Sequence, residues 1–548
     1  MSELEETIGS GETPTDRRID RRGFMTRMAA AGAAATAVPF VAESVAQANP
    51  LPLLIPNEDI RLSEVSDLTE LTLAQAATLI WKYKLSPVDL VEAHLERIAK
   101  FDGTYKAFNT VLADQALARA KTLSKRLPQG PLHGIPLAIK DNYYTQGVKT
   151  TANSYIFENF VPDYDATAVE RLQRRGAIVL GKTQMGPLAT TRATTPDGKV
   201  TTVNAWTPQT PSIDPGGSSS GSATATAGRM ACSSIGTQTG GSITAPSNAQ
   251  GLTGLKPTHG RVSAYGVIPL TYSRDHPGPL ARDAKDAAYM LQVMCGPDPN
   301  DPRTLGLPSP PNFVTAATPF RRGGKVQVRY RTKLGVLPGY TSGTTPTALA
   351  RKAMLDALAN VGVDVVDVTL PAEWDVLTGN AFNNVRLPER TEPFLDYMKQ
   401  DLKLFGVSLG SWMQGLFMSG DEWVKGQRAK FILLQRVLDD LFGQCDAVVQ
   451  TGPVPFDILG LPELALPIGF QPNATAGTDI PIGAIIGGQP YAEDRLLAIA
   501  AAYQAVTDWH SRRPADPVAP AATLRGLRDA APAEELTLSL EDVIATTQ

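Results

Sequence analysis

The alternation of short apolar runs with Gly-, Pro- and Ser-rich loops between residues 134 and 305 restricts the fold more than any other feature. GIPLAIK (134–140) and GAIVLGK (176–182) have the length of strands, and Ala-rich segments of helical length lie between such runs. This texture is typical of an α/β sheet. No Pro/Gly/Ser linker is long enough to separate the middle of the chain from its later segments, and 548 residues with 43% apolar composition can bury a large core. We therefore expect one large α/β domain.

The rest of the chain continues the pattern. Apolar spacing predicts helices over 71–84 and 87–100, and Ser86 followed by Pro87 is a typical helix start. Further buried strands are expected at 333–340, 361–371, 446–455 and 480–488, and further helical segments at 346–358, 389–442 and 495–510.

The N-terminus has the pattern of a targeting segment. Arg21 and Arg22 precede Phe24-Met25 and a weakly apolar Ala-rich run, and Ala46-Gln47-Ala48 supplies small residues for cleavage. An amphipathic helix or membrane anchor is the alternative, but the run of about 14 residues, interrupted by Pro39, is too short to span a bilayer. The sequence predicts a twin-arginine export signal and a periplasmic or secreted protein. The expected divisions are a signal (1–48), a linker (49–64), the α/β domain (65–511) and a peripheral or disordered tail (512–548).

Charge and metal-binding residue types exclude several classes of partner. The formal net charge is −4, and it becomes −2 (46 bases minus 48 acids) without residues 1–48. A near-neutral surface argues against nucleic acid or an anionic membrane as the main partner. The three cysteines (Cys232, Cys295 and Cys445) match no metal-ligand spacing, and the five histidines form no HxxxH or HxxEH pair. One disulfide is conceivable, but three buried thiols are favoured. We expect no metal and no cofactor.

Lys140 is the first candidate for chemistry, because it ends the apolar strand expected at 134–140. Desolvation at such a place lowers the pKa of a lysine toward a neutral amine that can act as a base. The alternative is that Lys140 reaches solvent or pairs with Asp141.

Two Gly/Ser-rich loops supply the other candidates. PGGSSSG (215–221) leads into an Ala-rich helix, an arrangement that alone indicates an anion nest or a flexible loop. In GTQTGGSITAPSN (236–248), Gly240 and Gly241 allow successive backbone N–H groups to point to one side, as an oxyanion hole beside a nucleophilic serine requires.

The joint occurrence of these segments resembles the amidase signature family of serine hydrolases. Ser218 follows Lys140 by 78 positions and Ser242 follows Ser218 by 24. The resemblance extends from LSPVDLVEAHLERIAKFDGTYKAFN through GLTGLKPTHGRVSAYGVIPL and GPLARDAKDAA, and weakly to IPIGAIIGGQPYAEDRLLAIAAAY. It implies a single α/β domain with a mixed, roughly eleven-stranded sheet. It also implies hydrolysis of a linear amide, anilide, peptide amide or carbamate through a Ser-cisSer-Lys triad, without a cofactor.

The resemblance also implies a role for each site residue. Ser242 would be the nucleophile, Ser218 the bridging serine after a cis bond from Gly217, and Lys140 the base. A serine can bridge because its hydroxyl both donates and accepts hydrogen bonds. The oxyanion hole would be formed by Thr239, Gly240 and Gly241 with the Ser242 amide, and Ser219 would help to hold Lys140.

Two residues depart from the family pattern. Family members commonly carry Asp where this chain has Gln238, and Arg where it has Thr244. Because both are neutral together, we expect an uncharged hydrogen-bonding pair to replace a usual ion pair, since removing both charges of a pair can be nearly neutral.

Three alternatives stay open. Gly217 to Gly221 also fits GxSxG, the nucleophile elbow of α/β-hydrolases with His510 downstream, but that motif follows a strand and TPQTPSIDPG precedes it here. The amidase subunit of a tRNA amidotransferase and a catalytically silent, exported amide- or peptide-binding protein are the others.

The substrate is expected to be a small-molecule or peptide amide. Candidate pocket walls are 153–164, 187–210 and 382–420, whose aromatic and Leu content favours a sizeable apolar acyl or aryl group. We expect no stable membrane insertion, and a monomer or homodimer.

Overall fold

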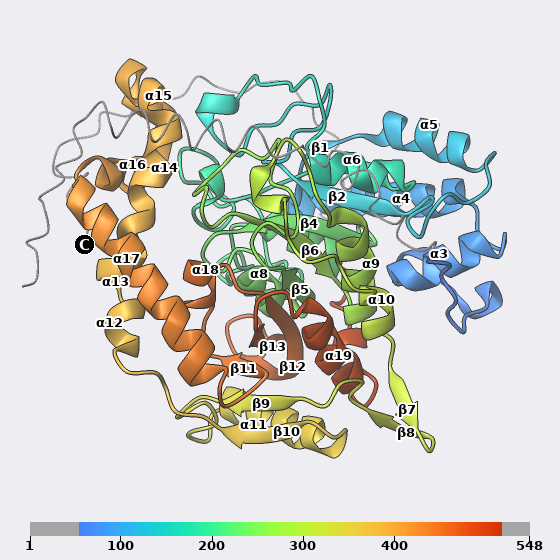
Figure 1. The fold of residues 1–548 in the computed structure, drawn as a ribbon. Helices are drawn as coiled ribbons and strands as arrows, with labels where there is room; N and C mark the ends of the chain where they lie inside the picture. The colour runs from blue at the N-terminus through green and yellow to red at the C-terminus, as the bar shows by residue number, and fades with distance from the viewer. Residues whose placement is uncertain (1–53, 518–548) are drawn as a thin grey trace, which may run out of the picture. The chain divides into compact units, whose positions relative to one another are not determined.

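The computed structural model describes residues 54–517, which contain an eleven-stranded mixed sheet and surrounding helices (Figure 1). The strand order is β1-β3-β2-β4-β6-β5-β12-β13-β11-β9-β10. The strands are β1 (Phe108–Val111), β2 (Pro136–Lys140), β3 (Ile178–Thr183), β4 (Ser233–Gln238), β5 (Thr253–Lys256), β6 (His276–Ala281), β9 (Lys333–Val336), β10 (Asp364–Asp367), β11 (Ala447–Gln450), β12 (Glu463–Asn473) and β13 (Thr478–Gly488). The expected α/β architecture is confirmed.

Strand β2 lies between two parallel neighbours, β3 and β4. Leu137 pairs with Ser233 and Ile139 with Ile235, so the carboxyl ends of β2 and β4 meet at one edge of the sheet. Every residue of both strands is buried, as is typical of parallel strands covered on both faces. This pairing brings Lys140 and Gln238, the last residues of the two strands, to the same edge.

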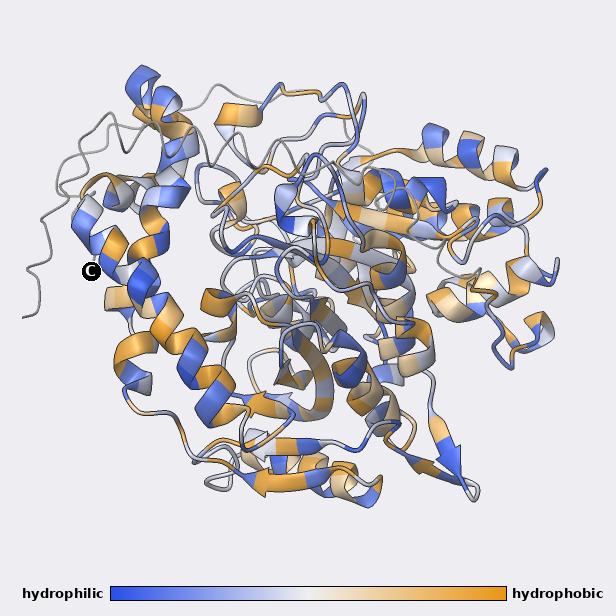
Figure 2. Cartoon of the chain, in the orientation of Figure 1, coloured by the Kyte–Doolittle hydropathy of each residue, from blue (hydrophilic) through white to orange (hydrophobic). Residues whose placement is uncertain are grey.

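The sheet separates two apolar clusters. Leu137 and Ile139 belong to a cluster with residues of α3, α6, α9, α10, α11 and α19, whereas Ala138 belongs to a second cluster with residues of α4, α5 and α7. Successive side chains of a strand point to opposite faces, so Lys140 shares the face of Ala138 and α7. Figure 2 shows the central strands β12 and β13 largely in the hydrophobic colours.

The helices follow local signals in the sequence. Helix α4 starts at Pro87, where Ser86 Oγ accepts from the Val88 amide at 3.1 Å, and α3 begins with a capping box of Thr72 and Gln75. The helices that surround the sheet include α3 (Leu73–Trp81), α4 (Pro87–Tyr105), α5 (Ala113–Leu123), α6 (Thr167–Arg174), α7 (Ser220–Ala227), α8 (Thr244–Gln250), α9 (Ala284–Met294), α10 (Phe313–Ala316), α11 (Pro346–Asn360) and α19 (Glu493–Gln504). No helix within 54–517 is long and apolar enough to cross a bilayer.

The helical segment expected at 389–442 is divided into three short helices and one of 17 residues. These are α14 (Leu387–Thr391), α15 (Leu395–Gln400), α16 (Leu409–Leu416) and α17 (Gly420–Arg436). One break falls at Gly406, whose φ is +51° and where a Cβ would lie 2.1 Å from the Pro196 carbonyl oxygen. Apolar periodicity predicted the helices there, but tight packing against residue 196 interrupts them.

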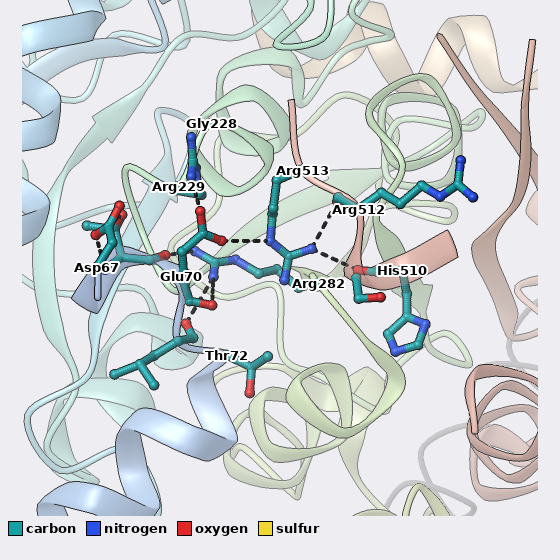
Figure 3. Close-up of polar contacts among 12 residues, drawn as sticks. Asp67, Glu70, Thr72, Gly228, Arg229, Arg282, His510, Arg512 and Arg513 are labelled. Carbon is teal, nitrogen blue, oxygen red and sulfur yellow. Dashed lines mark hydrogen bonds and ion pairs between the residues drawn. The ribbon is translucent and has the colours of Figure 1, made fainter. Parts of the chain in front are cut away.

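Ion pairs of Arg513 and Asp516 hold residues 512–517 against the domain, and Figure 3 shows the pair between Arg513 and Glu70. The Glu70 carboxylate pairs with Arg229 and lies 3.5 Å from Arg513 Nε, and Asp516 pairs with both Arg97 and Arg229. The predicted signal segment 1–48 lies outside the described residues, as does the tail beyond 517.

Candidate active site

Lys140 is fully buried at the end of β2, and its Nζ lies 2.8 Å from Ser218 Oγ. The same nitrogen is 2.9 Å from Thr237 Oγ1 and 3.3 Å from the Thr237 carbonyl oxygen. Asp141 instead pairs with Lys182, with 3.3 Å between Oδ1 and Nζ. The alternative in which Lys140 reaches solvent or pairs with Asp141 is therefore wrong.

Burial lowers the pKa of the Lys140 amine to about 7, although the negative charge of Asp275 acts in the opposite direction. A lysine that titrates near neutrality exists partly as the neutral amine, which can accept a proton. The Lys140 environment thus has the electrostatics that a general base requires.

The loop before α7 places Ser218. The Gly217–Ser218 peptide bond is cis, and Ser218 is fully buried. A Cβ on Gly217 would lie 2.6 Å from Arg192 Cα and from the Thr191 carbonyl oxygen, so only glycine fits between the two backbones. The described residues 201–219 contain no strand, and the GxSxG elbow therefore lacks the strand that it needs.

Ser219 contacts the Lys140 environment indirectly. Its Oγ donates to the Thr237 carbonyl oxygen at 3.4 Å, the same oxygen that Lys140 Nζ approaches. The Thr237 hydroxyl also accepts from Asn142 Nδ2 at 3.1 Å. The backbone and side chain of Thr237 therefore organise the base, a role that the sequence did not indicate.

Ser242 lies on the turn between β4 and α8. The residue is 7% exposed, and the preceding Gly241 has a φ of +92°, which favours glycine. Within residues 54–517, no acceptor takes a hydrogen bond from the amide N–H groups of Gly240, Gly241 or Ser242. The turn therefore presents backbone donors that the fold does not use.

Asp275 fixes the start of this turn, and sequence reasoning missed it. Thr239 Oγ1 donates to one carboxylate oxygen of Asp275, and the other oxygen accepts from the Leu270 and Thr271 amides at 2.8 and 3.0 Å. Burial raises the pKa of Asp275, although these hydrogen bonds oppose the shift. No local pattern around SRDHPG marks such a role, because the partner is 36 residues away.

Gln238 and Thr244 form an uncharged hydrogen-bonded pair, but through the Thr244 backbone amide; the Thr244 hydroxyl donates to the Gly241 carbonyl oxygen instead. Gln238 Oε1 accepts from the backbone amides of Ile243 and Thr244, both at 2.9 Å, at the start of α8. Gln238 Nε2 donates to Asp457 Oδ1 at 2.8 Å and to Glu463 Oε2 at 2.9 Å. The oxygen of the Gln238 side-chain amide thus accepts hydrogen bonds from the start of α8, and its nitrogen donates to two buried carboxylates.

Lys256 completes this buried polar group. Its Nζ lies 3.4 Å from Asp457 Oδ1 and 3.2 Å from Glu463 Oε2. Burial raises the pKa of Glu463 to about 8 and also raises that of Asp457, while Lys256 opposes both shifts. These partners lie more than 200 residues from Lys256 in sequence, so no local signal could reveal them.

Parts of the three expected pocket walls meet in one apolar cluster. Phe157 contacts Phe394 edge-on at 6.2 Å between ring centroids, and Phe394 contacts Trp412 at 6.0 Å. Leu188 and Ala189 belong to the same cluster.

The three cysteines are buried and unpaired, as expected. His510 lies in a 3₁₀ turn (Trp509–Ser511) beside the C-terminal ion pairs (Figure 3).

Comparison with known proteins identifies the family of the chain. Residues 89–388 match the family model described as "Amidase". A glutamyl-tRNA(Gln) amidotransferase subunit of Roseiflexus sp. is 34% identical over 82% of this chain and 99% of the relative, and that of Geotalea daltonii is 34% identical over 82% and 100%. The native peptide amidase of Stenotrophomonas maltophilia superposes with a TM-score of 0.68 at 28% identity, over 82% of this chain and 99% of that one. The chain therefore belongs to the amidase family and is a C–N hydrolase.

Proposed function

We propose that the protein hydrolyses a linear amide through an acyl-enzyme on Ser242. Neutral Lys140 takes a proton from Ser218, Ser218 takes one from Ser242, and Ser242 Oγ attacks the carbonyl carbon. The oxyanion that forms accepts hydrogen bonds from the backbone amides of residues 239–242. The proton returns through the same relay to the departing amine, and water then releases the acid.

The observation that carries this proposal is the 2.8 Å contact between Lys140 Nζ and Ser218 Oγ at a buried lysine whose pKa is about 7. The unused amides of the Ser242 turn support it, because a preorganised donor is worth roughly 3 kcal/mol to such a transition state.

The direct test offers the full chain a panel of amides, anilides, esters and carbamates, with Ser242→Ala and Lys140→Met variants beside it. Loss of turnover in both, and labelling of Ser242 by a serine-directed phosphonate, is expected. Ser342→Ala and Lys352→Met, at exposed positions, are the matched controls. Turnover that survives Ser242→Ala excludes the mechanism, and an unmodified protein that turns over nothing and resists the phosphonate supports the silent amide-binding alternative.

A second candidate is an amidase subunit of an amidotransferase, because the two relatives above are named as amidotransferase subunits. It predicts ammonia release from glutamine and co-purification with partner subunits. Hydrolysis of anilides by the isolated chain, with no glutaminase activity, favours the stand-alone amidase.

Export by the twin-arginine route remains part of the proposal, supported by Arg21, Arg22 and the small residues at 46–48. Fractionation of cells expressing the full chain, with an Arg21→Lys/Arg22→Lys variant, tests it. A processed protein outside the cytoplasm is expected, and the variant should stay inside unprocessed. Unprocessed protein in the cytoplasm for both forms contradicts export.

A further inference from the structure

Helix α17 carries apolar side chains on two opposite faces. Its inner face packs on the domain: Gly426, Ala429 and Leu433 are buried, and a Cβ on Gly426 would lie 1.9 Å from Val385 Cγ1. A surface helix normally has one apolar stripe, which faces the core. The outer face of α17, which runs along one side of the described residues in Figure 1, is therefore apolar without a partner in the domain.

Six large apolar side chains between residues 417 and 438 are exposed. These residues, here called the α17 stripe, are Phe417, Trp423, Val424, Phe431, Ile432 and Leu438. Phe417 and Phe431 are 78% and 72% exposed, and the other four are 37–50% exposed. Leu416, the last residue of α16, extends the patch at one end. Contiguous apolar patches of this kind mark interaction surfaces in soluble proteins.

The α17 stripe is symmetric about its own centre. Its members form three pairs, each equally far in sequence from the midpoint between Gln427 and Arg428: Phe417 with Leu438, Trp423 with Ile432, and Val424 with Phe431. A two-fold axis at that midpoint, perpendicular to α17, places every member level with its pair on an antiparallel second copy.

The directions of the side chains agree with this symmetry. Val424 and Phe431 are seven residues apart, close to two helical turns, and so lie on one line along α17. Because each residue turns the helix by about 100°, Trp423 and Ile432 lie on opposite sides of this line. The two-fold rotation brings these opposite sides together, so Ile432 of one copy meets Trp423 of the partner subunit.

The area of the stripe and the charges around it favour a second copy over a membrane. Its exposed side chains present on the order of 600 Å², since one aromatic side chain alone accounts for about 150–250 Å². Two copies would bury about 1,200 Å², the lower end for specific protein interfaces. Membrane-surface helices are rich in Lys and Arg on their polar face, whereas exposed acids stand at both ends of the stripe: Asp421, Glu422 and Asp439.

We infer that the α17 stripe is the contact of a two-fold symmetric homodimer, in which α17 lies antiparallel to α17 of the partner subunit. Phe431 of each copy packs against Val424 of the partner subunit, near the axis. The contact does not involve the residues proposed for the chemistry, so it can be tested whether or not an amide is hydrolysed.

Sedimentation velocity of the full chain, from about 0.1 to 100 µM, measures the association, because interfaces near this size span a wide range of affinities. A monomer–dimer equilibrium is expected. Val424→Glu and Phe431→Glu each place two charges in the contact and should raise its Kd at least about 100-fold. Leu349→Glu, at a 57% exposed position of α11, is the matched control and should leave the Kd unchanged.

A full chain that stays monomeric throughout this range overturns the inference, as do stripe variants that dimerise like the unmodified protein. A monomer that binds vesicles of phosphatidylcholine and phosphatidylglycerol, with loss of binding in Phe431→Glu, assigns the stripe to a membrane and also overturns it.

Disulfide formation tests the antiparallel register. Val424→Cys and Phe431→Cys proteins, mixed and oxidised, should form a disulfide with each other, because these positions lie opposite across the axis. Two copies of Val424→Cys should not cross-link, since the two residues are about 10 Å apart along the helices, beyond the reach of a disulfide. The native cysteines are buried and do not compete. Self-cross-linking of Val424→Cys in equal yield overturns the inference.

Discussion

The side-chain amide of Gln238 donates a 2.8 Å hydrogen bond to the buried carboxylate of Asp457, which follows it by 219 residues. This contact connects the end of β4, and hence the turn that carries Ser242, to the segment between β11 and β12. Gln238 also accepts hydrogen bonds from the amides of Ile243 and Thr244 at the start of α8. One neutral side chain therefore acts as donor to a buried carboxylate and as acceptor for a helix start.

Replacement of this amide by a carboxylate should be strongly destabilising. Gln238→Asp places a third acid beside Asp457 and Glu463 and removes the donor that both share, at an expected cost of about 3–5 kcal/mol. Urea unfolding of the variant measures it, with Gln129→Asp at an exposed position as the control. A loss below about 1 kcal/mol would show that the buried group tolerates the extra charge. The double variant Gln238→Asp/Thr244→Arg then tests whether the two charges that are usual in the family restore the free energy of unfolding.

The rate should depend on pH through Lys140. The amine is active only when neutral, so kcat/KM should rise with pH and reach half its plateau near pH 7, because burial lowers the pKa of Lys140 to about 7. A pH profile from 5 to 9 with a neutral anilide measures this limb. A profile that is flat across pH 6–8 contradicts a titrating lysine base.

The charge of Asp275 should affect the pH at which kcat/KM reaches half its plateau. Asp275 raises the pKa of Lys140, so Asp275→Asn should move the half-maximal pH of kcat/KM to a lower value. The same change weakens the acceptor of the Thr239 hydroxyl, and kcat should fall. Thr239→Val also removes that hydrogen bond but keeps the Asp275 charge, so a similar pH shift in both variants would exclude the electrostatic explanation.

Two glycines should respond in opposite directions to the same substitution. Gly217→Ala forces a methyl group against the backbone of residues 191 and 192, so stability and activity should both drop. Gly103→Ala lies in α4, where nothing is within 4 Å of the added Cβ, and should stabilise the protein by about 0.5–1 kcal/mol. Thermal unfolding of both variants provides the comparison, and a stable, active Gly217→Ala variant would contradict the close packing.

Local patterns predicted the parts of the fold whose causes are local. The apolar run 134–140 became β2 because a parallel central strand is buried on both faces, and Ser86-Pro87 started α4 because capping needs only neighbouring residues. The glycine-rich segments 215–221 and 236–248 stood out because they contain the turns before α7 and between β4 and α8, although the second segment also includes the end of β4 and the start of α8. Thr237, Asp275, Lys256 and the partners of Gln238 were missed or misassigned, because each acts through residues that only the folded sheet brings near.

The arrangement of the chain around the sheet also separates two kinds of change. Lys140 ends β2, Ser218 lies on the loop before α7, and Ser242 lies on the turn between β4 and α8, whereas Phe394 and Trp412 of the apolar cluster come from the helical segment between β10 and β11. An exchange of that segment between relatives is therefore expected to change the apolar cluster while the strands beside Lys140 stay unchanged. The residues proposed for the chemistry and the helices proposed as pocket walls therefore belong to separate segments of the chain, which can change independently of each other.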